Sequence, residues 1–196
     1  MKPPSAAFPE VTGAILTGGT SRRLGRDKVL LPYQGKPLVL HIYSILKDLF
    51  PKIFLIGHPR PELEALGLAC FPDRIPGKGA LGGLYTALNI AAAKYVFVAA
   101  ADMPFLTADL ISGILTYRHD ADAVIPKGPA GPEPLCAVYS TSCIRTIEHN
   151  LGKGSLKIIS ALEGLTIRFP EIEPDKGIPD PFFNINYPED LEALDD

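Results

Sequence analysis

Runs of consecutive apolar residues alternate with helical patterns through the first two thirds of the chain. These runs lack the polar–apolar alternation of a half-exposed strand, so each predicts a short strand that is buried on both faces. The predicted strands cover residues 11–17, 53–56, 95–100 and 121–125. Apolar residues at helical spacing lie between them and predict helices over residues 38–50, 61–66, 80–94 and 107–117. Buried strands that are separated by helices favour a parallel sheet covered on both faces.

The last third of the chain is less regular. It predicts strands over residues 135–139 and 166–169, helices over residues 141–150, 155–162 and 188–194, and a Gly/Pro-rich loop over residues 176–181. No repeat or low-complexity linker divides the chain, so we expect residues 1–196 to form a single domain. The expected fold class is α/β: a three-layer α/β/α sandwich around a Rossmann-like, mostly parallel sheet.

Composition narrows the function classes. The chain has 196 residues, a formal charge of −3 and a pI near 5.8, so it lacks the basic footprint of a nucleic-acid-binding protein. Three cysteines without a C-x-x-C pair indicate reduced thiols. Proline and glutamate in the first ten residues are not typical of a signal peptide, and the apolar run over residues 95–101 is too short for a membrane span. We therefore expect a soluble cytoplasmic protein without membrane or nucleic-acid partners.

The segment that carries chemistry is LTGGTSRRLGRDK, residues 16–28, directly after the first predicted strand. Glycines let backbone N–H groups approach a polyphosphate closely, and Arg22, Arg23 and Lys28 can neutralise phosphate charge. The segment is neither a Walker A loop nor a G-x-G-x-x-G fingerprint, because Gly25 is followed by arginine and the glycine spacing differs. We interpret it as a phosphate-binding loop; the alternative is a glycine-rich surface turn.

Asp102 follows the apolar run over residues 95–100, at the strand end where open α/β sheets bind their ligands. A carboxylate there can hold Mg²⁺ against a triphosphate. Alternatively, Asp102 only shapes the turn before Pro104. Gly82 and Gly83 stand near the start of a predicted helix, where each glycine costs about 1 kcal/mol relative to alanine. That cost indicates close approach of a ligand or of another helix, and we assign Gly82 to the nucleotide.

The loop resembles the L-A-G-G-x-S-x-R-M-G-x-D-K signature of the molybdenum-cofactor guanylyltransferases, the MobA family, with Thr17 for Ala and Leu24 for Met. Later segments agree in order: GKPLVLHIYSIL, PGKGALGGLYTAL, ADMPFL, EPLCAVY and FFNINYPEDL. The resemblance spans roughly residues 11–194. It implies a fold of the nucleotide-diphospho-sugar transferase type and transfer of GMP from GTP to the terminal phosphate of Mo-molybdopterin.

The resemblance also implies roles for individual residues. Asp102 would hold Mg²⁺, helped by Asn184 or Asn186, and Asp73 would contribute to GTP binding. In the mechanism that we expect, Lys28 and Arg23 neutralise charge that develops during transfer. The nucleotide would also be bound by the strand end and the paired glycines: Leu16, Thr17, Gly18 and Gly19.

Within the single domain we expect a nucleotide-binding half, roughly residues 11–126, and an acceptor-binding half, residues 127–196. Lys153, in GKGS at a predicted helix start, is a candidate for the pterin phosphate, although a plain helix cap is an alternative. Asn184 and Asn186 have a similar alternative, since asparagines before Pro188 also shape turns.

Two other functions stay open at this point. One is a cytidylyltransferase or sugar-phosphate nucleotidyltransferase of the same architecture, with another base pocket and acceptor. The other is a GTP-binding regulatory or adaptor protein without turnover, which the presence of both Lys28 and Asp102 disfavours. The expected substrates are GTP and Mo-molybdopterin, with transient contacts to other molybdenum-cofactor proteins.

Overall fold

A computed structural model describes residues 7–18, 27–172, 179–187 and 190 of the chain. Seven strands of this part form one sheet in the order β11-β7-β10-β6-β1-β4-β5. Their bounds are β1 (Val11–Leu16), β4 (Ile53–Ile56), β5 (Cys70–Phe71), β6 (Tyr95–Ala100), β7 (Ala123–Val124), β10 (Cys136–Ser140) and β11 (Ile167–Arg168). All pairs in the sheet are parallel except those that β10 makes with β6 and β7. The expected mostly parallel sheet is therefore confirmed.

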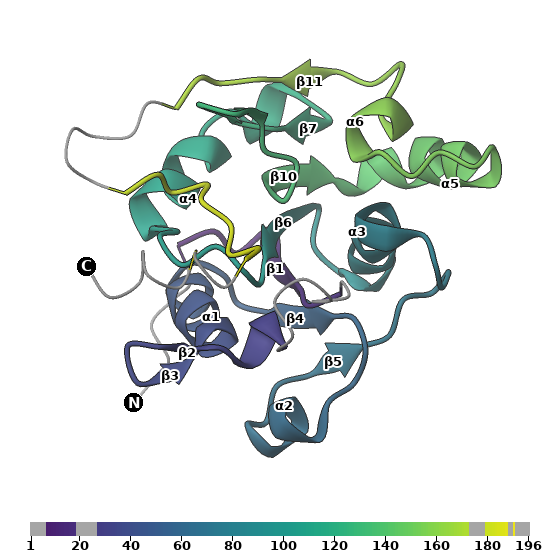
Figure 1. Cartoon of the computed structure of the whole chain (residues 1–196). Coiled ribbons are helices and arrows are strands. Elements are labelled where there is room, and N and C mark those ends of the chain that lie inside the picture. Colours follow the sequence, from purple (N-terminus) through teal and green to yellow (C-terminus); the bar gives the residue numbers. More distant parts are fainter. Residues whose placement is uncertain (1–6, 19–26, 173–178, 188–189, 191–196) are drawn as a thin grey trace.

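Helices cover both faces of this sheet (Figure 1). One face carries α1 (Leu38–Leu49) and α4 (Ala108–Leu115), and the other carries α3 (Gly79–Ile90), α5 (Ile144–Gly152) and α6 (Ile158–Ala161). The three-layer arrangement predicted from the sequence is thus confirmed.

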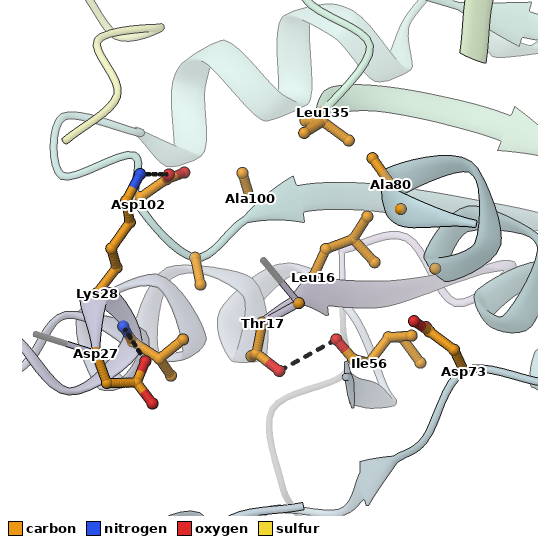
Figure 2. A pocket seen from close by; sticks show the side chains of 15 residues that line it. Leu16, Thr17, Asp27, Lys28, Ile56, Asp73, Ala80, Ala100, Asp102 and Leu135 are labelled. Carbon is orange, nitrogen blue, oxygen red and sulfur yellow. Dashed lines mark hydrogen bonds and ion pairs between the residues drawn. The ribbon is translucent and has the colours of Figure 1, made fainter. Parts of the chain in front are cut away.

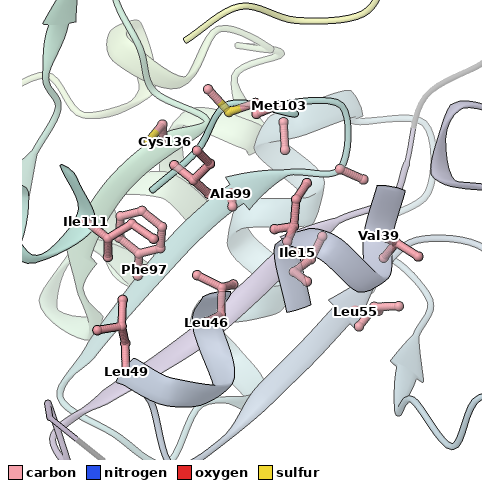
Figure 3. Close-up of a cluster of buried hydrophobic side chains, with 14 of the residues drawn as sticks. Ile15, Val39, Leu46, Leu49, Leu55, Phe97, Ala99, Met103, Ile111 and Cys136 are labelled. Atoms are coloured by element: carbon pink, nitrogen blue, oxygen red, sulfur yellow. The ribbon is translucent and has the colours of Figure 1, made fainter. Parts of the chain in front are cut away.

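Each central strand supplies side chains to two separate cores, since successive residues of a strand point to opposite faces. Ile15 of β1 and Phe97 of β6 pack with Leu46 of α1 in one core (Figure 3). The next residues along, Leu16 and Val98, belong to the core under α3 and α5. Every residue of β1 and β6 is buried, which explains their continuous apolar sequences.

Local signals fix several element ends. Phe50 caps α1 in an extended conformation before Pro51, and Thr107 caps α4 by accepting a hydrogen bond from the Leu110 N–H at 3.3 Å. The helix predicted over residues 80–94 is shorter, because Ala91 is extended and the chain turns into β6. The predicted final helix over residues 188–194 lies almost wholly outside the described residues.

The described part of the chain also contains shorter elements. They are η1 (Lys28–Leu30), the hairpin of β2 (Pro32–Tyr33) and β3 (Lys36–Pro37), α2 (Pro61–Ala65), η2 (Arg118–Asp120), the hairpin of β8 (Lys127–Gly128) and β9 (Gly131–Pro132), and η3 (Thr141–Cys143). The two hairpins and β5 were not predicted, because runs of two residues carry no detectable periodicity. No helix of the described part is long and apolar enough to cross a membrane.

The order of the central strands creates a place for a ligand. β4 and β6 pair with opposite sides of β1, and all three strands run parallel. The chain therefore leaves β1 toward one side and later returns on the other, which opens a crevice beyond the carboxyl ends of these strands. The Thr17 N–H donates to the Ile56 carbonyl at 2.8 Å and the Ala101 N–H to the Leu16 carbonyl at 3.1 Å, so pairing continues to the crevice.

Candidate active site

A cavity of about 300 Å³ lies at this crevice (Figure 2). Its lining comes from the ends of β1, β4 and β6, the start of α3 and the segment around η1. The residues are Leu16, Thr17, Gly18, Asp27, Lys28, Val29, Ile56, Asp73, Gly79, Ala80, Gly83, Ala100, Ala101, Asp102 and Leu135. Six residues assigned to the nucleotide from sequence thus meet in one cavity: Leu16, Thr17, Gly18, Lys28, Asp73 and Asp102.

The end of β1 is held tightly. Thr17 is buried, and its hydroxyl donates to the Ile56 carbonyl at 3.1 Å. Gly57 has a φ of +150°, and a Cβ there would lie 2.6 Å from the Thr17 hydroxyl oxygen and 2.9 Å from the Gly18 nitrogen. Glycine is therefore required at position 57 for the two strand ends to lie this close. This packing fixes the backbone from which the proposed phosphate loop departs.

Lys28 connects three distant parts of the chain. It begins η1, which Asp27 caps by accepting a hydrogen bond from the Val29 N–H at 3.1 Å. The Lys28 ammonium donates to Asp102 Oδ2 at 3.1 Å and to Asn186 Oδ1 at 2.7 Å. The side chains of Lys28 and Asp102 are 19% and 21% exposed, so the ion pair is partly shielded from water yet open to a ligand.

Two side-chain oxygens therefore converge on one cationic group. The Asp102 turn is tied to the C-terminal segment, because the Ile185 N–H donates to the Asp102 carbonyl at 3.0 Å. Asn184 is turned elsewhere: its amide donates to the Phe182 carbonyl at 2.7 Å. Of the two asparagines singled out in the sequence, Asn186 is the one that contacts Lys28, the partner of Asp102.

Asp73 and Gly83 form the opposite wall of the cavity. Burial raises the pKa of the Asp73 carboxyl, and the charge of nearby His58 acts in the other direction. A Cβ on Gly83 would lie 3.3 Å from both methyl carbons of Leu16, so this glycine keeps the cavity open. Gly82, assigned to the nucleotide from sequence, is outside the lining. A Cβ on Gly82 would lie 2.9 Å from Lys78 Cβ, which favours the alternative that Gly82 serves packing.

Lys153 has a different setting from the one expected. α5 extends to Gly152, and Lys153 caps its C-terminus, where its N–H donates to the His149 carbonyl at 3.2 Å. The expected helix start is therefore wrong, and with it the argument from a helix N-terminus. Lys153 lines a separate surface depression beside Arg145 and His149. Gly19, Arg22 and Arg23 lie outside the described residues, so their assignments stay predictions.

The charges of the lining are unusual for a phosphate site. Asp27, Asp73 and Asp102 contribute three carboxylates, against the single ammonium group of Lys28 among the described lining residues. A polyphosphate could enter only with additional positive charge. The sequence offers arginines in residues 19–26, and a divalent cation at Asp102 would supply the rest.

Sequence reasoning missed Arg60. Arg60 is not among the lining residues, but its guanidinium pairs with Asp27, with Nε donating to Asp27 Oδ2 at 2.5 Å. Position 60 stands in a short loop before α2, and no spacing in the sequence links it to residue 27. Only the packing of β4 beside β1 brings the two together.

Comparison with known proteins shows the family to which the chain belongs. Residues 13–165 match the model of the MobA-like NTP transferase domain. The chain belongs to this family. A probable molybdenum cofactor guanylyltransferase of Pelotomaculum thermopropionicum is 34% identical to this chain over 185 residues, which cover 93% of this chain and 90% of that protein.

Two solved structures have the same fold as this chain. The molybdopterin-guanine dinucleotide biosynthesis protein A of Archaeoglobus fulgidus superimposes with a TM-score of 0.79 at 29% identity, over 93% of this chain and 96% of that one. The 2-C-methyl-D-erythritol 4-phosphate cytidylyltransferase of Thermus thermophilus has a TM-score of 0.68 at 15% identity, over 92% and 95%. The second likeness concerns the fold alone, so the fold does not select the base.

Proposed function

We propose that this chain transfers GMP from GTP to Mo-molybdopterin, with release of pyrophosphate and formation of the molybdopterin guanine dinucleotide cofactor. The observation that carries the proposal is the partly shielded Lys28–Asp102 pair at the carboxyl ends of β1 and β6, in a chain of the MobA-like family. A cation for phosphates and a carboxylate for a metal are the two groups that nucleotidyl transfer needs from a protein.

The residues around Asp102 fit Mg²⁺. Magnesium prefers hard oxygen ligands and usually keeps several waters, with one or two carboxylates and substrate phosphates completing its shell. Asp102 Oδ2 and Asn186 Oδ1 supply two such oxygens, which already share one cationic partner in Lys28. We assign Asp102 and Asn186 as the protein ligands of Mg²⁺; when bound, the ion would stabilise charge on the triphosphate.

The chemistry requires no protein nucleophile. An oxygen of the acceptor phosphate forms a bond to the α-phosphorus of GTP, and the bond from that phosphorus to the bridging oxygen of the β-phosphate breaks. A phosphate is already ionised at neutral pH, so no general base is needed. Lys28 would neutralise charge on the departing pyrophosphate, the backbone N–H of Gly18 would bind phosphate oxygens, and Arg23 would assist from the loop.

The division of the chain into two halves is part of this proposal. Every residue of the cavity except Leu135 precedes residue 103, which supports residues 11–126 as the nucleotide-binding half. Residues 127–196 would then hold the acceptor, with Lys153 as a candidate and with transient contacts to other molybdenum-cofactor proteins. All three cysteines are free, which fits the reducing cytoplasm.

A panel of nucleotides tests the base. With Mg²⁺ present, GTP should raise the melting temperature more than CTP, UTP or ATP. At one hundred times its dissociation constant, a ligand adds about 2.7 kcal/mol of stability. A larger shift with CTP would move the protein to the cytidylyl alternative. Stabilisation by GTP without pyrophosphate release in the presence of Mo-molybdopterin would instead support a binding protein without turnover.

A further inference from the structure

Arg60 is not a lining residue, yet its guanidinium contacts two residues of the cavity. Nε donates to Asp27 Oδ2 at 2.5 Å, and Nη2 donates to the Thr17 carbonyl at 3.2 Å. Two longer contacts of 3.5 Å join Nη1 to the Thr17 hydroxyl and Nη2 to Asp27 Oδ1. The side chain is only 16% exposed. One guanidinium group thus bridges the end of β1 to the residue that precedes Lys28.

The turn that carries Arg60 is itself well held. Arg60 is the N-cap residue of α2, and its carbonyl accepts hydrogen bonds from Leu63 and Glu64 at 3.0 and 3.1 Å. Its Nη1 also donates to the His58 carbonyl at 3.1 Å. Gly57 lets this turn lie directly against Thr17. The guanidinium is therefore pre-organised by its own loop, and little side-chain entropy remains to be lost when the bridge forms.

The bridge leads directly to the catalytic lysine. Asp27 accepts from Arg60 and also caps η1 through the Val29 N–H, so both of its oxygens are engaged. Lys28 is the first residue of that capped turn and extends from it to Asp102. The position of the Lys28 backbone thus depends on where Arg60 holds Asp27.

From these contacts we propose that Arg60 is a positioning residue: it joins Asp27 to the end of β1 and so holds Lys28 opposite Asp102. The proposal rests on the role of Lys28 in nucleotidyl transfer given above. Arg60 also pairs with a carboxylate that would otherwise face an incoming triphosphate uncompensated. Lysine could supply the charge, but its single ammonium group lacks the planar fork that reaches both Asp27 and Thr17.

The experiment compares Arg60→Ala and Arg60→Lys with the wild type, with Arg118→Ala as a matched control. Arg118 is a similarly buried arginine, 13% exposed, whose Nε donates to Glu10 Oε1 at 3.0 Å before the start of β1, at the end of the strand away from the cavity. We expect Arg60→Ala to lower kcat for GMP transfer about tenfold or more, with a smaller change in KM for GTP. Arg60→Lys should recover only part of the loss. Arg118→Ala should lower stability and leave kcat unchanged.

Two further measurements separate positioning from general stability. Guanidinium ion at millimolar concentration should raise the kcat of Arg60→Ala severalfold and that of Arg118→Ala not at all. In a Lys28→Ala background, Arg60→Ala should lower kcat by less than about threefold more, since residues that act through one another are not additive. Full additivity in that background would overturn the proposal, as would a folded Arg60→Ala variant with wild-type kcat.

Hydrogen exchange of the Val29 amide tests the bridge without any measurement of turnover, because this amide donates to Asp27. The amide should exchange at least tenfold faster in Arg60→Ala, and also in Arg60→Gln should the alanine variant fail to fold. Unchanged protection in a folded variant would refute the bridge even if GMP transfer is confirmed. Absence of GTP turnover in the wild type would refute the proposed function instead, and the Val29 measurement would still decide whether Arg60 orders the turn.

Discussion

Replacement of Asp102 by Asn tests the reaction most directly. The change keeps the shape of the side chain and removes the charge that we assign to the metal. Loss of a metal contact of this kind removes several kcal/mol of transition-state stabilisation, and each 1.36 kcal/mol corresponds to tenfold in rate. We therefore expect kcat to fall about a hundredfold or more, with a much smaller effect on the Kd for GTP.

The same variant has a predictable effect on stability. Hydrogen bonds to charged groups contribute about 1.5–3 kcal/mol. Here the pair is about one-fifth exposed, and Lys28 keeps its bond to Asn186 at 2.7 Å, so we expect a loss of only about 1 kcal/mol. Urea denaturation without nucleotide or metal measures this loss.

The assay follows pyrophosphate release from GTP and Mo-molybdopterin as the Mg²⁺ concentration is varied. In Asp102→Asn the Mg²⁺ requirement should shift to higher concentration, and a chelator should abolish the wild-type rate. Asp109→Asn is the control, because Asp109 is an exposed carboxylate in the first turn of α4. A folded Asp102→Asn enzyme with normal kcat and normal Mg²⁺ dependence would refute the assignment and leave Asp102 as a partner of Lys28 only.

Two further substitutions test the cavity and the acceptor half. Gly83→Ala places a methyl group 3.3 Å from Leu16 and 3.8 Å from Asp73 Oδ1, so GTP should bind about tenfold more weakly. The stability of the fold should change little, because the higher helix propensity of alanine, about 1 kcal/mol, offsets the cost of the close contacts. Gly113→Ala is the control: nothing lies within 4 Å of its new Cβ, so this variant should gain stability without loss of GTP binding. A wild-type affinity of Gly83→Ala for GTP in a titration would contradict this view of the cavity. Burial, together with the charge of Asp180, raises the pKa of Glu133 from 4.5 to about 7. Between these two pH values the folded protein binds more protons than the unfolded chain, so the stability of the fold falls as the pH rises. Glu133→Gln should therefore stabilise the protein at pH 8 by on the order of 1 kcal/mol and much less at pH 5, and an equal effect at both pH values in urea denaturation would disprove the titration.

The central strands and the two side chains that we propose for catalysis, Lys28 and Asp102, could be predicted from the sequence alone. Strands β1 and β6 are recognisable because a parallel sheet with helices on both faces buries every residue of its central strands. The first two residues of β4 are only partly buried, but its four consecutive apolar residues still predict a strand. Asp102 follows from the same logic, because it stands just after β6 and ligands bind at strand carboxyl ends. Lys28 is singled out by the glycine-rich, basic segment that follows β1. Each of these signals lies within a single short segment, so it can be recognised without knowing the rest of the fold.

Choices between neighbouring residues required the tertiary structure. Adjacent positions on a helix point about 100° apart, so only the packing of α3 shows that Gly83 lines the cavity and Gly82 faces Lys78. Asn186 is distinguished from Asn184 only by a contact across 158 positions of sequence to Lys28.

The antiparallel course of β10 and the bridge from Arg60 to Asp27 also required the tertiary structure. Such contacts depend on which strand ends meet in space. The periodicity of the sequence determines which residues are buried but not which loops become neighbours, and that physical limit left Arg60 out of the site predicted from sequence.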